Sequence, residues 1–420
     1  MSIERDPGEK AFLKRLGPGL ITGAADDDPS GIATYSQAGA QFGVNMLWTV
    51  VLTFPLMAAI QAICARIGRV TGEGLASNMA HVLPRWQVHG IVFLLFIANT
   101  VNIGADIVAM GAAARLVLGW GETLFAILFA AGSLALQVFV PYHLYVHVLK
   151  WLTLALFAYV GVLFFVQIDW GSVILATVWP QISWTRETFT VVVAILGTTI
   201  SPYLFFWQSA QEVEDEKLEG AGPLRDHPEA APPELSRIGF DTYVGMAFSN
   251  LIAFFIILTT AVTLNRAGIT DISTSAEAAE ALRPIAGELA FLLFSLGIIG
   301  TGLLALPVLA GSAAYAVAEL RGWSLGLEKA PQEARGFYGV IALAMGLGLL
   351  MLFLPIDPIK ALFWSAVLNG VIAVPLMIAT MIVVSNRKHL GEFAAPPRLK
   401  VMGWLATAVM AAAALAMFLL

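Results

Sequence analysis

Apolar runs of about 20 residues recur from one end of this 420-residue chain to the other. Each run is long enough to cross a hydrocarbon core of about 30 Å as a helix. Only 12% of the residues are charged, while 58% are hydrophobic. A water-soluble domain carries roughly twice that charged fraction. The sequence therefore predicts an all-α polytopic membrane protein.

Eleven membrane spans are expected. The connections between them are short, apart from a polar loop near residues 211–238, so we expect residues 1–420 to form a single transmembrane domain. The predicted spans lie near residues 17–41, 44–68, 87–117, 123–141, 145–168, 189–210, 239–264, 287–318, 336–354, 358–384 and 399–419.

The positions of Lys and Arg predict the orientation of the chain, because cytoplasmic loops carry an excess of both. A cytoplasmic N-terminus leaves only five of the 23 basic residues on the outer side, namely Arg115, Arg186, Arg266, Arg283 and Lys360. An odd number of spans then places the C-terminus outside. The lipid bilayer is the expected environment of the whole chain.

Charge and cysteine content exclude several classes of protein. A formal net charge of -6 gives no sign of nucleic-acid binding. The single cysteine, Cys64, rules out a disulfide framework or a cysteine metal cluster within one chain. No cleavable signal peptide is evident at the N-terminus. We expect a monomer without a resident cofactor.

Two spans contain helix-breaking residues at mid-membrane depth. The first contains GAADDDPSG around Pro29, and the sixth contains GTTISPYLFFWQ around Pro202. Each proline removes a backbone donor, and Gly23, Gly31 and Gly197 are expected to permit further departure from helical geometry. Unwound backbone at this depth must be buried in protein or line a cavity. Interrupted helices at matching positions in two halves are typical of the central site of a transporter with inverted repeats.

Asp28 immediately precedes the first break. A buried carboxylate costs several kcal/mol unless it is paired or solvated, and neither broken span contains Lys or Arg. A bound cation is the simplest partner, and oxygen ligands suit Mg²⁺, Mn²⁺ or Ca²⁺. On a helix, Asp26 and Asp27 point about 200° and 100° away from Asp28. We expect them to line a water-exposed vestibule that concentrates cations, with direct metal binding by Asp27 as the less favoured alternative.

The runs GPGLITGAADDDPSGIATYSQAGAQFG and QAICARIGRVTGEGL resemble the first two helices of the Nramp family of divalent-metal transporters. The resemblance covers helices 1 to 3 well and helix 6 moderately. It implies a LeuT-type fold with two inverted five-helix repeats, near residues 17–168 and 189–384, and an eleventh helix near 399–419. It also implies alternating-access transport of a divalent cation and no enzymatic activity.

The resemblance assigns metal ligands to both breaks, and this sequence departs from the family's motifs there. The ligand aspartate is kept as Asp28, and the two ligand carbonyls correspond to Ala25 and Thr198. The family's asparagine falls on Gly31, and its methionine falls on Ser201. Loss of the soft sulfur and a wider, all-oxygen site favour a largely hydrated Mg²⁺, with Mn²⁺ tolerated. In this respect the chain is similar to the Nramp-related magnesium transporters of prokaryotic inner membranes.

The residues that carry protons in the family are also partly absent. Its acidic pair on helix 3 corresponds to Asp106 and Ala109, and its helix-6 histidine corresponds to Tyr203, which does not titrate near neutral pH. We therefore expect uncoupled uptake of the cation. Proton-coupled transport of Mn²⁺ or Fe²⁺, as in other Nramp proteins, is the alternative.

Other polar residues are weaker candidates. Gln208 is a candidate for holding a metal-bound water, whereas the adjacent Trp207 is expected to pack. Asn369 in span 10 is either a metal ligand or the donor of an interhelical hydrogen bond. The segment DISTSAEAAEALRP predicts the start of a capped helix. A solvated charge run is the favoured interpretation of Glu212, Glu214, Asp215 and Glu216.

Two other functions remain open. An intramembrane aspartyl protease would need two catalytic aspartates on separate spans, for which Asp28 and Asp106 are the candidates. A sodium-coupled symporter of organic solutes would share the fold. Its anionic substrate would be attracted to half-helix N-termini, where three consecutive aspartates would repel it.

Overall fold

The computed structural model describes residues 18–141, 144 and 152–420, and this part of the chain contains helices and no strand. Nine of its helical segments are long and apolar enough to cross a membrane by length and composition. The segment Pro29–Thr71 holds parts of two predicted spans. The predicted span at 145–168 falls partly on residues outside the described ranges.

In the described ranges, thirteen helices build the predicted spans, and shorter helices connect them. The first group is α2 (Pro18–Asp26), α3 (Pro29–Phe42), α4 (Leu47–Thr71), α6 (Arg85–Leu118), α7 (Glu122–Phe139), α9 (Phe157–Val162), α11 (Arg186–Thr199), α12 (Pro202–Leu218), α13 (Ala231–Thr260), α16 (Ala290–Arg321), α17 (Arg335–Leu349), α18 (Pro358–Ser385) and α20 (Pro397–Leu419). The connecting helices are α5 (Leu75–Val82), α10 (Trp170–Val178), α14 (Ser275–Ala279), α15 (Arg283–Ala286) and α19 (Arg387–Leu390).

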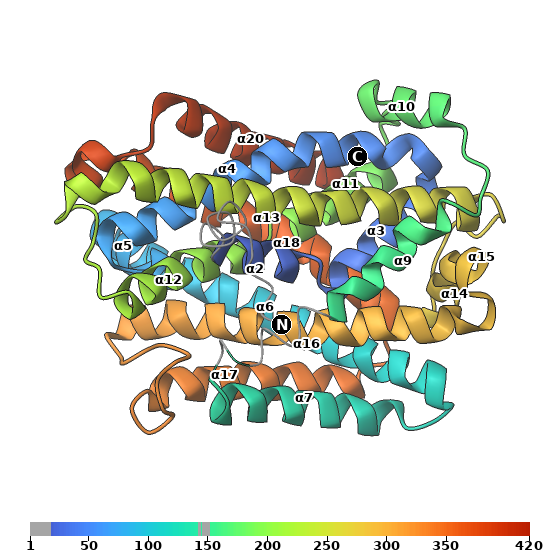
Figure 1. The fold of residues 1–420 in the computed structure, drawn as a ribbon, viewed down its shortest axis with the longest axis horizontal. Coiled ribbons are helices and arrows are strands. Elements are labelled where there is room, and N and C mark those ends of the chain that lie inside the picture. The colour runs from blue at the N-terminus through green and yellow to red at the C-terminus, as the bar shows by residue number, and fades with distance from the viewer. Residues whose placement is uncertain (1–17, 142–143, 145–151) are drawn as a thin grey trace, which may run out of the picture.

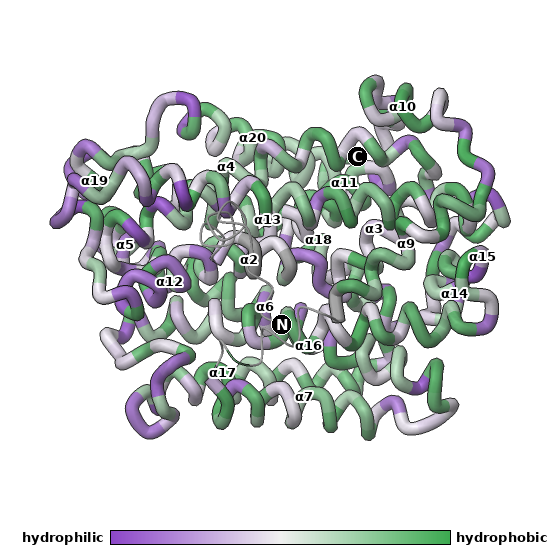
Figure 2. Tube along the Cα trace, in the orientation of Figure 1, coloured by the Kyte–Doolittle hydropathy of each residue, from purple (hydrophilic) through white to green (hydrophobic). Residues whose placement is uncertain are grey.

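The broken helices lie in the middle of the bundle. Figure 1 shows α13 and α16 running across the molecule on either side of α2, α3 and α18. Helices α7 and α17 form one outer layer, and α4 and α20 lie on the opposite side. Hydrophilic residues gather mainly at the two ends of the bundle, while the long helices between them are largely apolar (Figure 2). This distribution is the one expected for a protein that crosses a bilayer.

Both predicted breaks are present. Helix α2 ends at Asp26 and α3 begins at Pro29, while α11 ends at Thr199 and α12 begins at Pro202. Each proline occupies the first position of its new helix, where the missing N–H costs nothing and φ is already helical. The sequence prediction of two discontinuous helices is confirmed.

The predicted role of the glycines in loosening these helices is wrong. Gly23, Gly31 and Gly197 are not among the glycines with positive φ. Two of them permit close helix contact instead. A Cβ on Gly23 would clash with the backbone of Gly245 in α13, and one on Gly197 would clash with the carbonyl oxygen of Ala366 in α18. Small residues let transmembrane backbones approach each other in this way.

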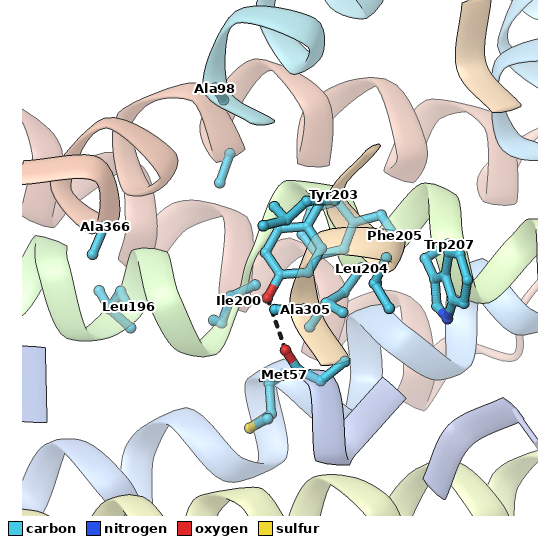
Figure 3. Packing of buried hydrophobic residues seen from close by; sticks show 14 of the residues in the cluster. Met57, Ala98, Leu196, Ile200, Tyr203, Leu204, Phe205, Trp207, Ala305 and Ala366 are labelled. Atoms are coloured by element: carbon cyan, nitrogen blue, oxygen red, sulfur yellow. Dashed lines mark hydrogen bonds between the residues drawn. The ribbon is translucent and has the colours of Figure 1, made fainter. Parts of the chain in front are cut away.

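The start of α12 is anchored in the core by large side chains. Tyr203, Phe205 and Trp207 are fully buried, and Figure 3 shows them projecting from α12 among residues of α4, α11 and α16. The ring of Trp207 meets that of Tyr315 edge to face, with 6.2 Å between centroids. The expectation that Trp207 packs is therefore correct.

A methyl group at the α2–α13 contact should destabilise the protein. We expect Gly23→Ala to cost about 1–3 kcal/mol, because overpacking a tight contact forces the backbones apart. The apparent midpoint of thermal unfolding in detergent should fall accordingly. Gly132→Ala in α7 is the matched control, since a Cβ there meets nothing within 4 Å. Equal midpoints for the two variants would contradict the contact.

Candidate metal-binding site

The two prolines leave two backbone carbonyls without helical partners. In an α-helix the N–H of residue i donates to the carbonyl of residue i−4. Pro29 and Pro202 have no N–H, so the carbonyls of Ala25 and Thr198 lose that bond. The family resemblance assigns metal-binding roles to these same two carbonyls.

Side chains at the start of α12 hydrogen-bond to both carbonyls. The hydroxyl of Tyr203 donates to the oxygen of Ala25 at 3.1 Å, across the two broken helices (Figure 3). The hydroxyl of Ser201 donates to the oxygen of Thr198 at 2.6 Å. A carbonyl oxygen has two lone pairs, so each can still accept a cation.

Asp28 is the N-cap residue of α3 and is buried. One carboxylate oxygen accepts from the Ser30 hydroxyl at 2.6 Å and from the Gly31 N–H at 2.7 Å. The other accepts from the Asn102 amide at 2.9 Å. No Lys or Arg of the described ranges pairs with it. Three neutral donors thus hold the carboxylate, and its capping role alone gives it a structural function.

Sequence reasoning missed Asn102. Its amide nitrogen binds Asp28, and its amide oxygen accepts from the hydroxyl of Ser365 in α18 at 2.8 Å. The residue therefore connects α3, α6 and α18 at the site. A sequence signal existed, since Asn102 is an amide in an apolar span, one helical turn before Asp106. Asp106 is buried, and neither carboxylate oxygen has a hydrogen-bond partner in the described ranges.

The two aspartates before Asp28 do not line a water-exposed vestibule, so that expectation is wrong. Asp26 and Asp27 are buried. The hydroxyl of Ser249 in α13 lies 2.6 Å from a carboxylate oxygen of Asp26 and 3.2 Å from one of Asp27. Because α2 packs against α13, these side chains contact another helix and not water.

The space beside Gly31 is partly filled. A Cβ at this position would lie 3.2 Å from the Thr198 hydroxyl and 3.4 Å from the ring of Tyr35. The Thr198 hydroxyl is also 3.5 Å from that of Ser30. The two breaks therefore meet through small hydroxyl-bearing residues. The space beside Gly31 is smaller than the wider site that the sequence predicted.

Gln208 and Asn369 lie differently with respect to this group. The amide of Gln208 accepts from the Thr22 hydroxyl at 2.5 Å and donates to Glu212 at 3.3 Å, so it links α2 to the acidic end of α12. Asn369 lies one turn beyond Ser365 on the same face of α18. Its amide is buried and makes no hydrogen bond in the described ranges, so the alternative of an interhelical hydrogen bond is wrong.

The acidic residues within α12 do not form a solvated charge run, so the interpretation favoured from the sequence is wrong. Glu212 is buried and pairs with Arg237 of α13 at 2.9 Å. Glu216 is buried and lies 3.8 Å from Arg69 of α4. Arg237 and Arg69 both contact Glu234 as well. The run instead joins α4, α12 and α13 at one end of the bundle.

The oxygen groups at the two breaks are the carboxylate of Asp28, the carbonyls of Ala25 and Thr198, the Asn102 amide and several hydroxyls. No group of three or more His, Cys, Asp or Glu side chains in the described ranges is arranged to hold a metal. A cation here would therefore depend on backbone and neutral oxygens beside Asp28. Such oxygen donors suit Mg²⁺, Ca²⁺ and Mn²⁺.

Comparison with known proteins supports a transporter. Proteins named divalent metal cation transporter MntH are 25–26% identical to this chain. The relative from Caldanaerobacter subterraneus subsp. tengcongensis aligns over 94% of this chain and 90% of its own length at 25% identity. The one from Aeromonas hydrophila aligns over 96% and 95%, also at 25% identity. These names agree with the prediction that the chain is not an enzyme.

Solved structures share the fold. A manganese transporter of Eremococcus coleocola superposes with a TM-score of 0.74 at 15% identity, covering 99% of this chain and 88% of that one. Mhp1, a nucleobase-cation-symport-1 family transporter, superposes with a TM-score of 0.57 at 13% identity, covering 95% and 92%. The chain has the LeuT-type fold of two inverted five-helix repeats and an eleventh helix. The model of the Natural resistance-associated macrophage protein-like family matches residues 19–420, and the chain belongs to this Nramp family.

Proposed function

We propose that this protein carries divalent metal cations across the membrane by alternating access. The cation is held between the two breaks by Asp28 and the carbonyls of Ala25 and Thr198. The observation that carries the proposal is that the two breaks meet. The Tyr203 hydroxyl of α12 donates to the Ala25 carbonyl of α2, and the Ser30 hydroxyl, which donates to Asp28, lies 3.5 Å from that of Thr198. Rocking of one half of the fold against the other would expose this point to each side in turn.

Manganese is the cargo that the comparisons favour. The similar proteins are named divalent metal cation or manganese transporters, which supports the Mn²⁺ alternative better than the Mg²⁺ expectation. Carboxylate and carbonyl oxygens suit Mn²⁺ as well as Mg²⁺. Mg²⁺ is the second candidate, because Ser201 occupies the position of the family's methionine and no sulfur ligand is present there. The hydroxyl of Ser201 donates to the Thr198 carbonyl.

The proposed setting is a prokaryotic inner membrane with the N-terminus in the cytoplasm. Helices α5, α12 and α19 lie at one end of the bundle (Figure 2), and most basic residues of the described ranges belong to these helices or to the adjoining helix ends and loops, as expected for a cytoplasmic face. Residues 1–17 lie outside the described ranges, so the basic residues there add only a sequence argument. Helices α2 to α9 and α11 to α18 are the proposed repeats, and α20 is the eleventh span.

Removing the charge of Asp28 should abolish transport. We expect Asp28→Asn to lower Mn²⁺ uptake into proteoliposomes at least about tenfold, because even partners that only orient a metal ligand are worth 10- to 100-fold. Asn102→Ala should have a smaller effect in the same direction. Tracer uptake and calorimetric titration with Mn²⁺, Mg²⁺ and Ca²⁺ measure both variants.

Asp169→Asn provides the matched control for that experiment. Asp169 is also an N-cap aspartate that accepts backbone hydrogen bonds, but it is exposed and lies at the start of α10. Uptake by this variant should equal that of the wild type. Unchanged Mn²⁺ binding in Asp28→Asn would overturn the proposed site.

Restoring a thioether at Ser201 should change metal preference. We expect Ser201→Met to increase the inhibition of Mn²⁺ uptake by the soft ion Cd²⁺, because thioether sulfur favours softer metals. Ser201→Leu has a similar volume without sulfur and should not have this effect. A competition series with Mg²⁺ in the wild type also distinguishes the two candidate cargoes, and a lack of competition would exclude Mg²⁺.

Proton coupling has a candidate carrier in Asp106. Its buried carboxyl group lies one turn from Asn102 and has no hydrogen-bond partner in the described ranges. If the protein is coupled, Mn²⁺ uptake should acidify vesicles containing a pH-sensitive dye, and Asp106→Asn should abolish acidification. Mn²⁺ entry without acidification in the wild type would support the uncoupled mechanism expected from the sequence.

A further inference from the structure

A groove separate from the metal site opens between α4, α13 and α20. Helix α4 packs against both other helices and contributes Ala62 and Arg66 to the lining. The cavity has a volume of about 290 Å³. Its apolar lining includes Ala62, Leu235, Ile238, Leu399 and Met402, and it also contains Arg66 and Arg398.

Within the described ranges, the two arginines have no anionic partner. Arg66 donates from Nε to the carbonyl of Phe393 at 2.7 Å, which leaves its two terminal nitrogens available. Neither Arg66 nor Arg398 forms an ion pair with any residue in the described ranges. Two guanidinium groups in one cavity repel each other, and an anion between them would relieve that repulsion.

The start of α20 adds to the positive potential. Helix α20 begins at Pro397 with no side-chain cap and no acidic residue in its first turn. The unpaired N–H groups of a first turn and the helix dipole both favour an anion. Arg398 lies in this turn, so backbone and side-chain donors are close together.

The groove lies on the outer surface of the helix bundle, which a bilayer would contact. On α20 the side chain of Val401 is 65% exposed, and on α13 that of Tyr243, which also lines the groove, is 45% exposed. Along α4, Ala62 lies one turn from Arg66 toward the middle of the span. The cavity thus has a cationic end at the predicted cytoplasmic interface and an apolar end toward the membrane interior.

We propose that this groove binds an anionic phospholipid of the cytoplasmic leaflet. The phosphate lies between Arg66, Arg398 and the first turn of α20, and the adjoining part of an acyl chain lies along Ala62 and Met402. Basic pockets between transmembrane helices on the cytoplasmic side recognise anionic headgroups in this manner. A water-soluble phosphate would use the cationic end but not the apolar wall.

Lipid binding to the purified full-length chain tests the proposal. Delipidated protein in detergent is titrated with dioleoyl phosphatidylglycerol, dioleoyl phosphatidylcholine or inorganic phosphate, and native mass spectrometry measures the bound lipid. We expect phosphatidylglycerol to bind more tightly than phosphatidylcholine and to raise the unfolding temperature. Removing each arginine, as in Arg66→Gln and Arg398→Gln, should weaken phosphatidylglycerol binding about fivefold.

A steric variant tests the groove itself. A Cβ on Gly239, which lines the groove, meets nothing within 4 Å, so Gly239→Leu should fold and should block the acyl chain. Gly346→Leu in α17 is the matched control, because a Cβ there also meets nothing within 4 Å. Arg335→Gln, at the start of α17 and outside the groove, controls for loss of one positive charge.

Three results would overturn the proposal. Equal binding of the two lipids would exclude recognition of the headgroup charge. Equal stabilisation by inorganic phosphate and phosphatidylglycerol would show a small-anion site in place of a lipid site. If the Arg66→Gln, Arg398→Gln and Gly239→Leu variants all bind phosphatidylglycerol as the wild type does, the lipid binds elsewhere on the protein.

Discussion

Two missing backbone donors organise the centre of this protein. Because proline has no N–H, Pro29 frees the carbonyl of Ala25, and Pro202 frees that of Thr198. In a membrane interior these oxygens must find another partner. Hydroxyls at the start of α12 supply it. The same defect therefore produces an interhelical contact and frees the two carbonyls that we propose as cation ligands.

The carboxylate of Asp28 is buried without a positively charged partner in the described ranges. Its oxygens accept from Ser30, Gly31 and Asn102, so burial is offset by neutral donors without a positive charge. Neutral donors hold the geometry and leave the negative charge in place. A lysine or arginine would neutralise that charge and compete with the metal. The ionic contacts are found elsewhere, where Arg69 and Arg237 join α4, α12 and α13.

The relatives and the geometry of the proposed site both bear on which cation is carried. The relatives favour Mn²⁺, while the absence of a sulfur at Ser201 leaves an oxygen-rich site that also suits Mg²⁺. The Thr198 hydroxyl and the Tyr35 ring leave little space beside Gly31, because a Cβ added there would lie 3.2 Å and 3.4 Å from them. A narrower pocket leaves less room for the water that Mg²⁺ retains. The relatives and the limited space beside Gly31 therefore favour Mn²⁺, whereas the all-oxygen donor set suits both ions.

The sequence by itself determined the helical membrane class, both breaks and the helix start at Thr274, which forms a capping box with Glu277. These features follow from local hydropathy, proline and capping chemistry, which act within a few residues. Only the tertiary structure decided the partners of Asp26, Glu212 and Asn102, because each contacts a residue more than 20 positions away. It also reassigned Gly23 and Gly197 from backbone flexibility to helix packing. Solvation of a charged side chain depends on which helix lies against it, and no local pattern contains that information.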